Sequence, residues 1–439
     1  MSLTPLPLPR LKRLAKEGSW IVVGQITSVA ASLVLVRVLT EQLEPTQYGQ
    51  LALGLTVAGL ANQVVMGGIT AGIGRFYSIA AEKQDLYGYL RASRRLMGCA
   101  TVAVLIIGLV LMVGLLWLGY SQWLGLAAAA LIFSVLSAYN ASLSGIQNAA
   151  RQRAIVAFHG GLDGWLRILL AVGVMLWLGN SSTVVVIGYA LSSLLVTGSQ
   201  FIFLRRLIKH QSKPGGANSL WMRQMWVYSW PMAVGGLFNW GYYASQRWAL
   251  ELFTMPGEVG YFYALTQIAY TPISMAGAMF LSFLTPILFA RAGNATDHDR
   301  LRNTQRIVMH VAVVGLGFTL GVAVISHFIH DFIFRLMVAS EYRHISIYMP
   351  YVILAAGILQ VSQSIAVLVA IENQTSRFLP LAIIGNSAIA LMNFYFTREW
   401  GIDGLITSMV VGATIHLTWM ILIVFKNVER LHRSGSTWA

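Results

Sequence analysis

The sequence predicts an all-α membrane protein that crosses the bilayer many times and consists of two related halves. Of its 439 residues, 56% are hydrophobic and only 10% are charged, with a mean hydropathy of +0.66, whereas a soluble domain carries about 25% charged residues. Apolar windows of about 20 residues, long enough to cross the hydrocarbon, recur along the chain. A repeated pattern of polar and aromatic residues divides these windows into two sets.

The repeat relates the first apolar window to one that begins in the second half of the chain. Matching residues keep identical spacing in the two copies: Ser19, Trp20, Arg37 and Glu41, then Ser229, Trp230, Arg247 and Glu251. Gly49 and Gly260 follow the two windows, with one residue inserted in the second copy. Many transporters build a central pathway from duplicated membrane halves, so the repeat favours a transport function.

Reading the chain in such windows gives twelve predicted membrane spans, six in each half. The first six cover residues 18–40, 48–72, 95–118, 121–145, 153–178 and 183–206. The second six cover residues 226–250, 258–290, 304–327, 347–370, 378–397 and 402–426. We therefore predict an N-terminal six-helix bundle over 1–206, a cytoplasmic linker over 207–225 and a C-terminal six-helix bundle over 226–439.

The basic residues predict that both termini are cytoplasmic. The net charge of +14 comes from 30 Lys and Arg against 16 Asp and Glu, and most of the basic residues fall in alternate loops. The exceptions are Arg335, Arg343 and Arg398 in the opposite loops, and Arg37, Arg167 and Arg247 within spans. Because Lys and Arg are enriched in cytoplasmic loops and attract anionic lipid, the charge does not indicate a nucleic-acid partner.

Arg37 and Arg247 are the first candidates for a functional site, since each lies near the outer end of the first span of its half. Each has a glutamate four residues later, on the same helical face. The two arginines could line a path for an anionic substrate or form charge pairs at an outer gate. The alternative is an arginine that extends to the interface and positions the helix end.

Asp163 and Arg167 lie four residues apart near the middle of the fifth span. A charged group at this depth costs about 2.5–3.5 kcal/mol even on insertion scales, so the two side chains should meet and face protein or water. One interpretation is a substrate or proton site, with Asp163 as the carboxylate and Arg167 as a phosphate donor. The other is a neutralised structural pair.

Two further groups are weaker candidates. Arg75 could contact lipid phosphate at the cytoplasmic entrance, or it could be an ordinary basic residue of that face. Trp240, Tyr243 and Gln246 in the seventh span have the aromatic and amide groups that suit sugar rings and hydroxyls. Aromatic belts at the membrane interface explain many such clusters without any ligand.

No feature of the sequence indicates an enzyme. It has no phosphate-binding loop of the ATPase type and no combination of nucleophile, acid pair or metal-ligand spacing. Cys99 is the single cysteine, so neither an internal disulfide nor a cysteine metal cluster is expected. We expect no cofactor and no bound metal.

Four short segments resemble one family of transporters. Residues 39–49, which include Glu44-Pro45-Thr46-Gln47-Tyr48-Gly49, are similar to the turn after the first helix of polysaccharide-unit flippases of the O-antigen, or Wzx, type. Residues 145–151 resemble that family's turn between helices four and five. Residues 340–342 resemble the segment before helix ten, and residues 401–404 resemble the start of helix twelve. The sequence departs from the family at Leu39-Thr40, where an acidic stretch replaces a short glycine turn. These flippases belong to the multidrug/oligosaccharidyl-lipid/polysaccharide exporter superfamily.

The resemblance implies two six-helix lobes around a cationic central cavity in a bacterial inner membrane. It also implies alternating-access transport of polyprenyl-pyrophosphate-linked oligosaccharide from the cytoplasmic to the periplasmic leaflet, next to polymerase and chain-length proteins. The arginines then take specific roles. Arg37, Arg167 and Arg247 would bind the headgroup, Arg75 would receive it, and Asp163 would couple transport to an ion.

Two other functions remain open at this point. A multidrug or toxin exporter has the same superfamily fold, but it usually binds organic cations in an acidic cavity, and the first span here has no carboxylate before Glu41. A scaffold subunit of a polysaccharide assembly complex would move nothing itself. A strain that lacks the protein distinguishes these possibilities.

Overall fold

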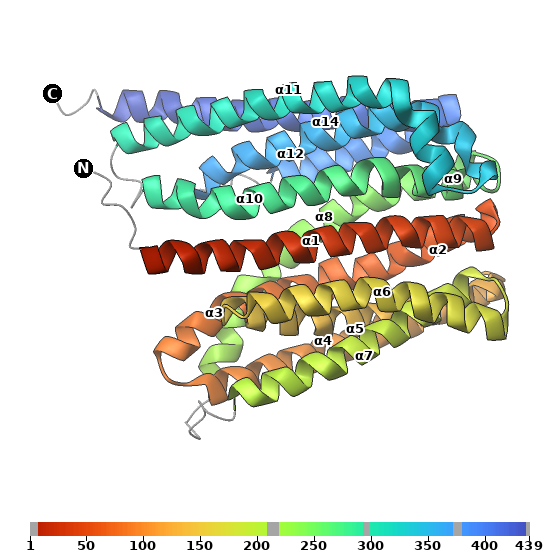
Figure 1. The fold of residues 1–439 in the computed structure, drawn as a ribbon, viewed down its shortest axis with the longest axis horizontal. Coiled ribbons are helices and arrows are strands. Elements are labelled where there is room, and N and C mark those ends of the chain that lie inside the picture. Colours follow the sequence, from red (N-terminus) through yellow and green to blue (C-terminus); the bar gives the residue numbers. More distant parts are fainter. Residues whose placement is uncertain (1–7, 209–218, 293–297, 372–379, 436–439) are drawn as a thin grey trace. The chain divides into compact units, whose positions relative to one another are not determined.

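The structure is a computed structural model that describes residues 8–208, 219–292, 298–371 and 380–435 (Figure 1). Every element in these ranges is helical, and ten helices are long and apolar enough to cross a membrane. The protein is therefore an all-α, multi-pass membrane protein, as predicted. Part of the predicted linker, residues 209–218, lies outside the described ranges.

The long helices follow the predicted spans closely. The bounds in the first half are α1 Leu8–Gln42, α2 Pro45–Leu60, α3 Gly67–Glu82, α4 Leu86–Trp117, α5 Leu124–Ala149, α6 Arg153–Leu178 and α7 Ser182–Ile208. Those in the second half are α8 Ser219–Phe253, α9 Glu258–Leu265, α10 Thr271–Ala292, α11 His298–Met337, α12 Met349–Ile371 and α14 Asn386–Gly435. Three π-helical segments lie between or before them: η1 Ala61–Met66, η3 Thr266–Tyr270 and η6 Leu381–Gly385.

The predicted number of twelve spans exceeds the ten that the described residues show, for two reasons. From Leu381 on, the predicted spans 378–397 and 402–426 run through η6 and α14 as one apolar stretch, and α14 is interrupted where Gly401 adopts a positive φ of 57°. The predicted span 226–250 lies in α8, whose tryptophans, tyrosines and arginines leave it outside the ten. The number of twelve, in two six-helix bundles, stays a prediction.

The chain forms two compact units. Unit 1 comprises residues 1–38 and 50–240, and unit 2 comprises residues 39–49 and 241–439. The boundaries differ from those of the predicted bundles, because the start of α8 packs with the first half and the turn after α1 packs with the second. The bundles follow the sequence repeat rather than these contacts, and their division at 206 and 226 stays a prediction.

In unit 1, helix α7 packs against α5 and α6 (Figure 1), and the beginning of α8 is held against α3 and α4. Trp221 donates from its indole nitrogen to Oδ2 of Asp85 at 2.7 Å. The hydroxyl of Tyr89 donates to the carbonyl of Ile73 at 2.6 Å, and Met225 is fully buried among these helices. Since buried polar groups need partners, the bond from Trp221 fixes the start of α8 to unit 1.

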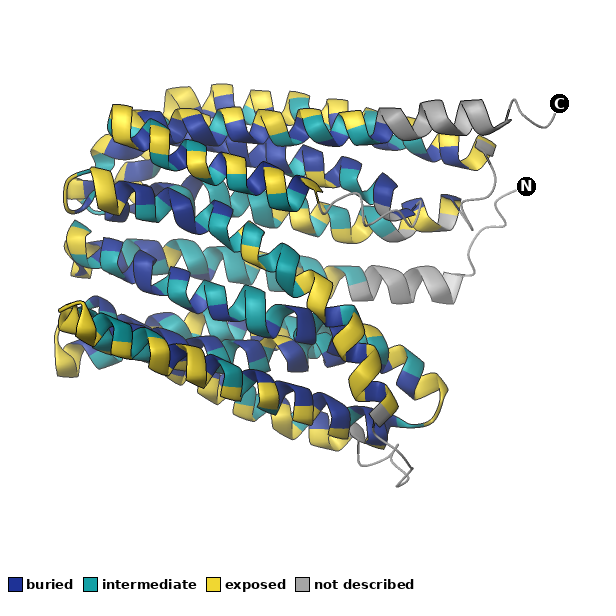
Figure 2. Cartoon of the chain, turned by 180° about the vertical axis from the view of Figure 1, so that it is seen from behind, coloured by how far each residue is buried: buried dark blue, intermediate teal, exposed yellow. Residues whose placement is uncertain are grey.

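The surface of the helices has the character expected in a membrane. Buried and exposed positions alternate around each helix in Figure 2, and many exposed positions carry large apolar side chains. On α4, for example, Leu105, Ile106 and Leu109 are 60%, 59% and 64% exposed. Such faces fit a hydrocarbon environment, because lipid is as apolar as leucine itself.

In unit 2, α12 packs against α11 and α14, and the turn over residues 39–49 is bound to the same unit. The hydroxyl of Tyr342 donates to the carbonyl of Leu43 at 2.9 Å, and the amide of Ala339 donates to Oγ1 of Thr40 at 3.2 Å. The ring of Tyr48 lies 5.0 Å from that of Tyr263. The segment that follows the first span is therefore part of the core of unit 2.

The two repeated glycines meet within unit 2. A Cβ atom on Gly49 would lie 3.0 Å from the amide nitrogen of Gly260, and one on Gly260 would overlap the carbonyl of Pro45.

We expect Gly260→Ala to lower the free energy of unfolding by about 1–3 kcal/mol, as overpacking does. The thermal melting of the purified protein measures this effect. Gly241→Ala is the matched control, because a Cβ there meets nothing within 4 Å and alanine favours the helix. Equal melting temperatures for the two variants would contradict the prediction.

Candidate substrate-binding site

The predicted pair in the fifth span forms within unit 1, on α6. The guanidinium of Arg167 donates to Oδ2 of Asp163 at 2.6 Å, and the exposed fractions of the two side chains are 29% and 13%. The hydroxyl of Ser192, on α7, donates to the other carboxylate oxygen at 3.0 Å. The prediction that these charges meet is confirmed. Both oxygens of Asp163 have a donor, as a buried carboxylate requires.

Aromatic rings surround the guanidinium of Arg167. Its central carbon lies 5.2 Å from the ring of Phe133 on α5 and 5.8 Å from the ring of Tyr189 on α7. These contacts are cation–π interactions, and they orient Arg167 toward Asp163. The Nε atom is buried and has no hydrogen-bond partner among the described residues. Arg167 therefore keeps one donor that an anion could use if the helices separated.

The other two predicted cations of unit 1 have different surroundings. Arg37 is half-buried near the end of α1. Arg75 is exposed on α3, and its guanidinium lies 5.6 Å from the ring of Tyr228 on α8. An exposed arginine beside an aromatic ring is available to a phosphate group that approaches from the membrane surface.

Arg247 lies in the part of α8 that belongs to unit 2. It is half-buried, and its guanidinium lies 4.8 Å from the ring of Tyr263 on α9. One turn earlier, the hydroxyl of Tyr243 lies 3.1 Å from that of Tyr270 in the π-helix η3. Gln246 is buried, and its amide nitrogen has no hydrogen-bond partner among the described residues. A cation, three phenol groups and an amide thus lie on α8, α9 and η3.

A row of polar side chains continues from Tyr263 along the same face. Nε2 of Gln267 donates to the hydroxyl of Tyr263 at 3.0 Å, and the hydroxyl of Thr271 donates to Oε1 of Gln267 at 2.7 Å. Sequence reasoning missed Gln267 and Tyr270, although their spacing from Tyr263 and Thr271 carries a signal. The π-helix shifts the side chains of residues 266–270 relative to a regular helix, and such segments occur frequently at functional sites.

Trp240 belongs to unit 1, whereas the other two predicted sugar contacts, Tyr243 and Gln246, belong to unit 2. Its indole nitrogen donates to the carbonyl of Thr56 at 2.8 Å within unit 1. This bond uses the single polar group of the side chain and leaves only the ring face for a ligand. Sugar contact by Trp240, Tyr243 and Gln246 stays a prediction.

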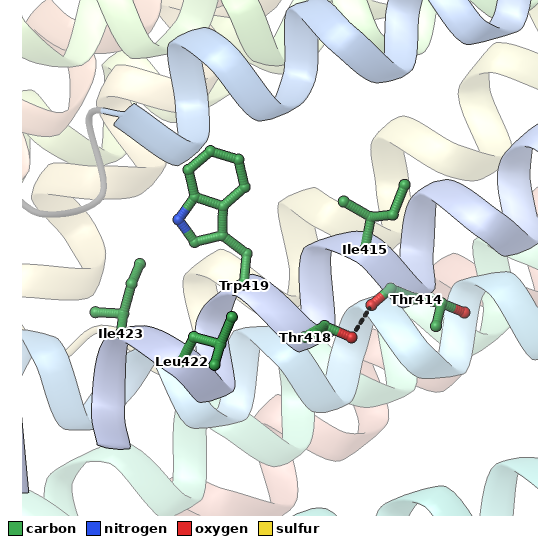
Figure 3. Close-up of a pocket in the computed structure, with 6 residues that line it drawn as sticks. All are labelled: Thr414, Ile415, Thr418, Trp419, Leu422 and Ile423. Carbon is green, nitrogen blue, oxygen red and sulfur yellow. Dashed lines mark hydrogen bonds between the residues drawn. The ribbon is translucent and has the colours of Figure 1, made fainter. Parts of the chain in front are cut away.

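A hollow of about 500 Å³ lies beside the second part of α14 in unit 2. Figure 3 shows its described lining, which is Thr414, Ile415, Thr418, Trp419, Leu422 and Ile423. The hydroxyl of Thr418 donates to the carbonyl of Thr414 at 2.8 Å, so it is already used within the helix. This lining has no charged group, so it provides no cation for an anionic ligand, whereas Arg247 does.

Comparison with known proteins gives a family match and several similar folds. Residues 14–291 match the family described as "Polysaccharide biosynthesis protein". No curated protein matches the chain. A mutant of the MATE transporter VcmN of Vibrio cholerae has a similar fold, with a TM-score of 0.62 and 17% identity over 95% of this chain and 97% of that one.

Two further solved structures resemble the chain over most of its length. Lipid II flippase MurJ, in an inward closed conformation, has a TM-score of 0.64 and 12% identity over 93% of this chain and 87% of that one. A MOP superfamily transporter from Pyrococcus furiosus has a TM-score of 0.58 and 13% identity over 93% and 96%. At these identities the structures show the fold alone. With the family match, they confirm the resemblance predicted from the sequence.

Proposed function

The chain belongs to the polysaccharide biosynthesis protein family, and from this membership we propose that it is a lipid-linked oligosaccharide flippase. It moves polyprenyl-pyrophosphate-linked glycan units from the cytoplasmic to the periplasmic leaflet by alternating access. The observation that supports this most directly is the surroundings of Arg247. A half-buried guanidinium lies against the ring of Tyr263, whose hydroxyl accepts from the amide of Gln267. One turn earlier on α8, the hydroxyl of Tyr243 meets that of Tyr270.

These groups match the two parts of such a headgroup. Arginine presents planar pairs of N–H donors to phosphate oxygens, and bonds of this kind are among the strongest in proteins. Tyrosine rings and amides suit the faces and hydroxyls of sugars, as at many polar ligand sites. The lipid tail can remain in the bilayer while the headgroup passes. In unit 1, we assign Arg37 and Arg167 to headgroup binding and Arg75 to the arrival of the headgroup. Asp163 is assigned to ion coupling, which requires its pair with Arg167 to open during transport.

An ion-coupled exporter of drugs or toxins is the second candidate, and Asp163 is the observation that favours it. A buried carboxylate can bind an organic cation or a proton. In this structure, however, Arg167 and Ser192 already occupy both of its oxygens. A binding site for an organic cation would need a carboxylate that is not already neutralised by Arg167. The flippase is therefore the better-supported proposal.

A strain that lacks the protein provides the test. We expect lipid-linked glycan units to accumulate on the cytoplasmic face of the inner membrane, and surface polysaccharide to fall, because a pyrophosphate cannot cross hydrocarbon unaided. Extraction of labelled lipid-linked units, with a probe that reaches only one leaflet, measures the effect. Normal surface glycan with mislocalised polymerase or chain-length proteins would instead indicate a scaffold. Loss of drug resistance with normal glycan would indicate an exporter.

A further inference from the structure

A groove of about 330 Å³ opens on the side of unit 1, between α3, α4 and α8. We call it the α4–α8 groove, and its lining includes Val64 and Ile69, Leu96 and Cys99, and Trp226 and Trp230. Small residues are part of the lining. Gly68 is one of them, and a Cβ atom there would overlap the carbonyl of Ser229 and force α3 and α8 apart.

The α4–α8 groove is open and apolar. Trp226 is 55% exposed and Trp230 is 53% exposed at its edge, and α3 and α4 both belong to membrane-spanning segments. A void beside apolar side chains loses dispersion contacts unless something fills it. In a bilayer, the material available to fill the groove is hydrocarbon chain.

Three arginines lie at one end of the groove. On α4, Arg95 precedes Cys99 by four residues, and on α8, Arg223 precedes Trp226 by three, so each lies one turn below the groove on the same helical face. On α3, Arg75 follows the groove residue Ile69 by six residues, toward the end where Arg95 and Arg223 lie. Its guanidinium contacts the ring of Tyr228, which precedes Ser229 in the groove. All three side chains are exposed, and the predicted topology places them on the cytoplasmic side.

We propose that the α4–α8 groove binds the first isoprene units of the polyprenyl chain while Arg75, Arg95 and Arg223 bind its pyrophosphate. This inference rests on the proposed function and adds a site for the tail outside the headgroup path. The charges decide between two lipids. A phospholipid offers one phosphate group, whereas a pyrophosphate offers two adjacent groups, which suit three guanidinium groups better.

Cys99 provides a direct test, because it is the only cysteine of the chain and is exposed in the groove. The full-length protein is placed in bilayers of zwitterionic lipid, and alkylation of Cys99 by a maleimide is timed. We expect long-chain polyprenyl pyrophosphate to slow alkylation about tenfold when about nine-tenths of the sites are occupied, since only the free fraction reacts. Polyprenol without phosphate and inorganic pyrophosphate should each protect far less.

The comparison lipid is phosphatidylglycerol, an anionic lipid with acyl chains. If it protects Cys99 as well as polyprenyl pyrophosphate does, the groove is an ordinary acyl-chain site and the proposal is wrong. Absence of protection by polyprenyl pyrophosphate overturns it as well. Changing Arg75, Arg95 and Arg223 together to alanine should restore fast alkylation. These residues are exposed, so the fold should tolerate the changes.

A second variant separates this site from the proposed function. Ala103→Phe fills the groove, and Val102→Phe is the matched control because Val102 is 56% exposed on a different face of α4. We expect the first to lose both protection of Cys99 and glycan transport, and the second to keep both. If Ala103→Phe inserts and transports normally while the unmodified protein moves the lipid, the groove proposal fails and the flippase stands. If the unmodified protein moves no lipid-linked glycan but Cys99 is protected, the flippase fails and the binding site stands.

Discussion

Replacing Arg247 by alanine should lower the transport of lipid-linked glycan by about 10- to 100-fold while the protein still inserts. The reason is that a hydrogen bond to a charged group contributes about 1.5–3 kcal/mol, and each 1.4 kcal/mol is a factor of ten. Arg247 is half-buried against Tyr263. Surface polysaccharide, normalised to the amount of membrane-inserted protein, measures the loss.

Arg247→Lys makes the prediction more specific. Lysine keeps the charge but lacks the planar pair of donors and the stacking surface, so we expect transport to remain clearly below that of the unmodified protein. Arg335→Ala is the matched control, because Arg335 is an exposed arginine whose ion-pair partner is Asp331 on the same helix. If Arg247→Lys transports at the normal rate, Arg247 supplies charge alone. If Arg247→Ala does so too, it has no part in headgroup binding.

Tyr263→Phe tests the surroundings of Arg247 without removing the ring. Phenylalanine keeps the cation–π contact with the guanidinium, but it loses the hydroxyl that accepts from Gln267 at 3.0 Å. If membrane insertion is nearly normal but glycan transport falls, the row of polar side chains from Tyr263 to Thr271 contacts the substrate. An effect on melting alone would assign the row to the packing of unit 2.

Much of the fold follows from local sequence. The apolar windows predict nearly every long helix, because length and hydropathy are properties of one segment. The interruption at Gly401 is also local, since glycine adopts a positive φ without steric cost. The assignment of α8 to both units is not local. It depends on contacts such as that between Trp221 and Asp85, which are far apart in the chain.

The candidate site shows the same limit. The spacing of Asp163 and Arg167 predicts their contact, because residues four apart share a helical face. Ser192, Phe133 and Tyr189 complete that site from other helices, and no spacing along the chain indicates them. Gln267 differs from these three, because it lies four residues from both Tyr263 and Thr271 and its contacts follow that spacing.

The pair in unit 1 should be the position most sensitive to a single substitution. Asp163→Asn leaves the partly buried Arg167 without its counter-charge. Removing one partner of a fully buried ion pair costs about 3–5 kcal/mol, and this partly buried pair should lose somewhat less. We therefore expect this variant to melt at a much lower temperature and to accumulate poorly in the membrane. Arg167→Gln should behave similarly, since it leaves the carboxylate with Ser192 as its remaining donor.

The double variant Asp163→Asn with Arg167→Gln distinguishes a structural pair from a functional one. Two amides of similar size remove both charges and can hydrogen-bond to each other, so we expect most of the lost thermal stability to return. Transport should not return, because the donor for the headgroup and the carboxylate for ion coupling are both absent. Melting of the purified protein and glycan export from the same cells measure the two properties separately. A double variant that melts and exports like the unmodified protein would show that the pair only neutralises itself within the helices.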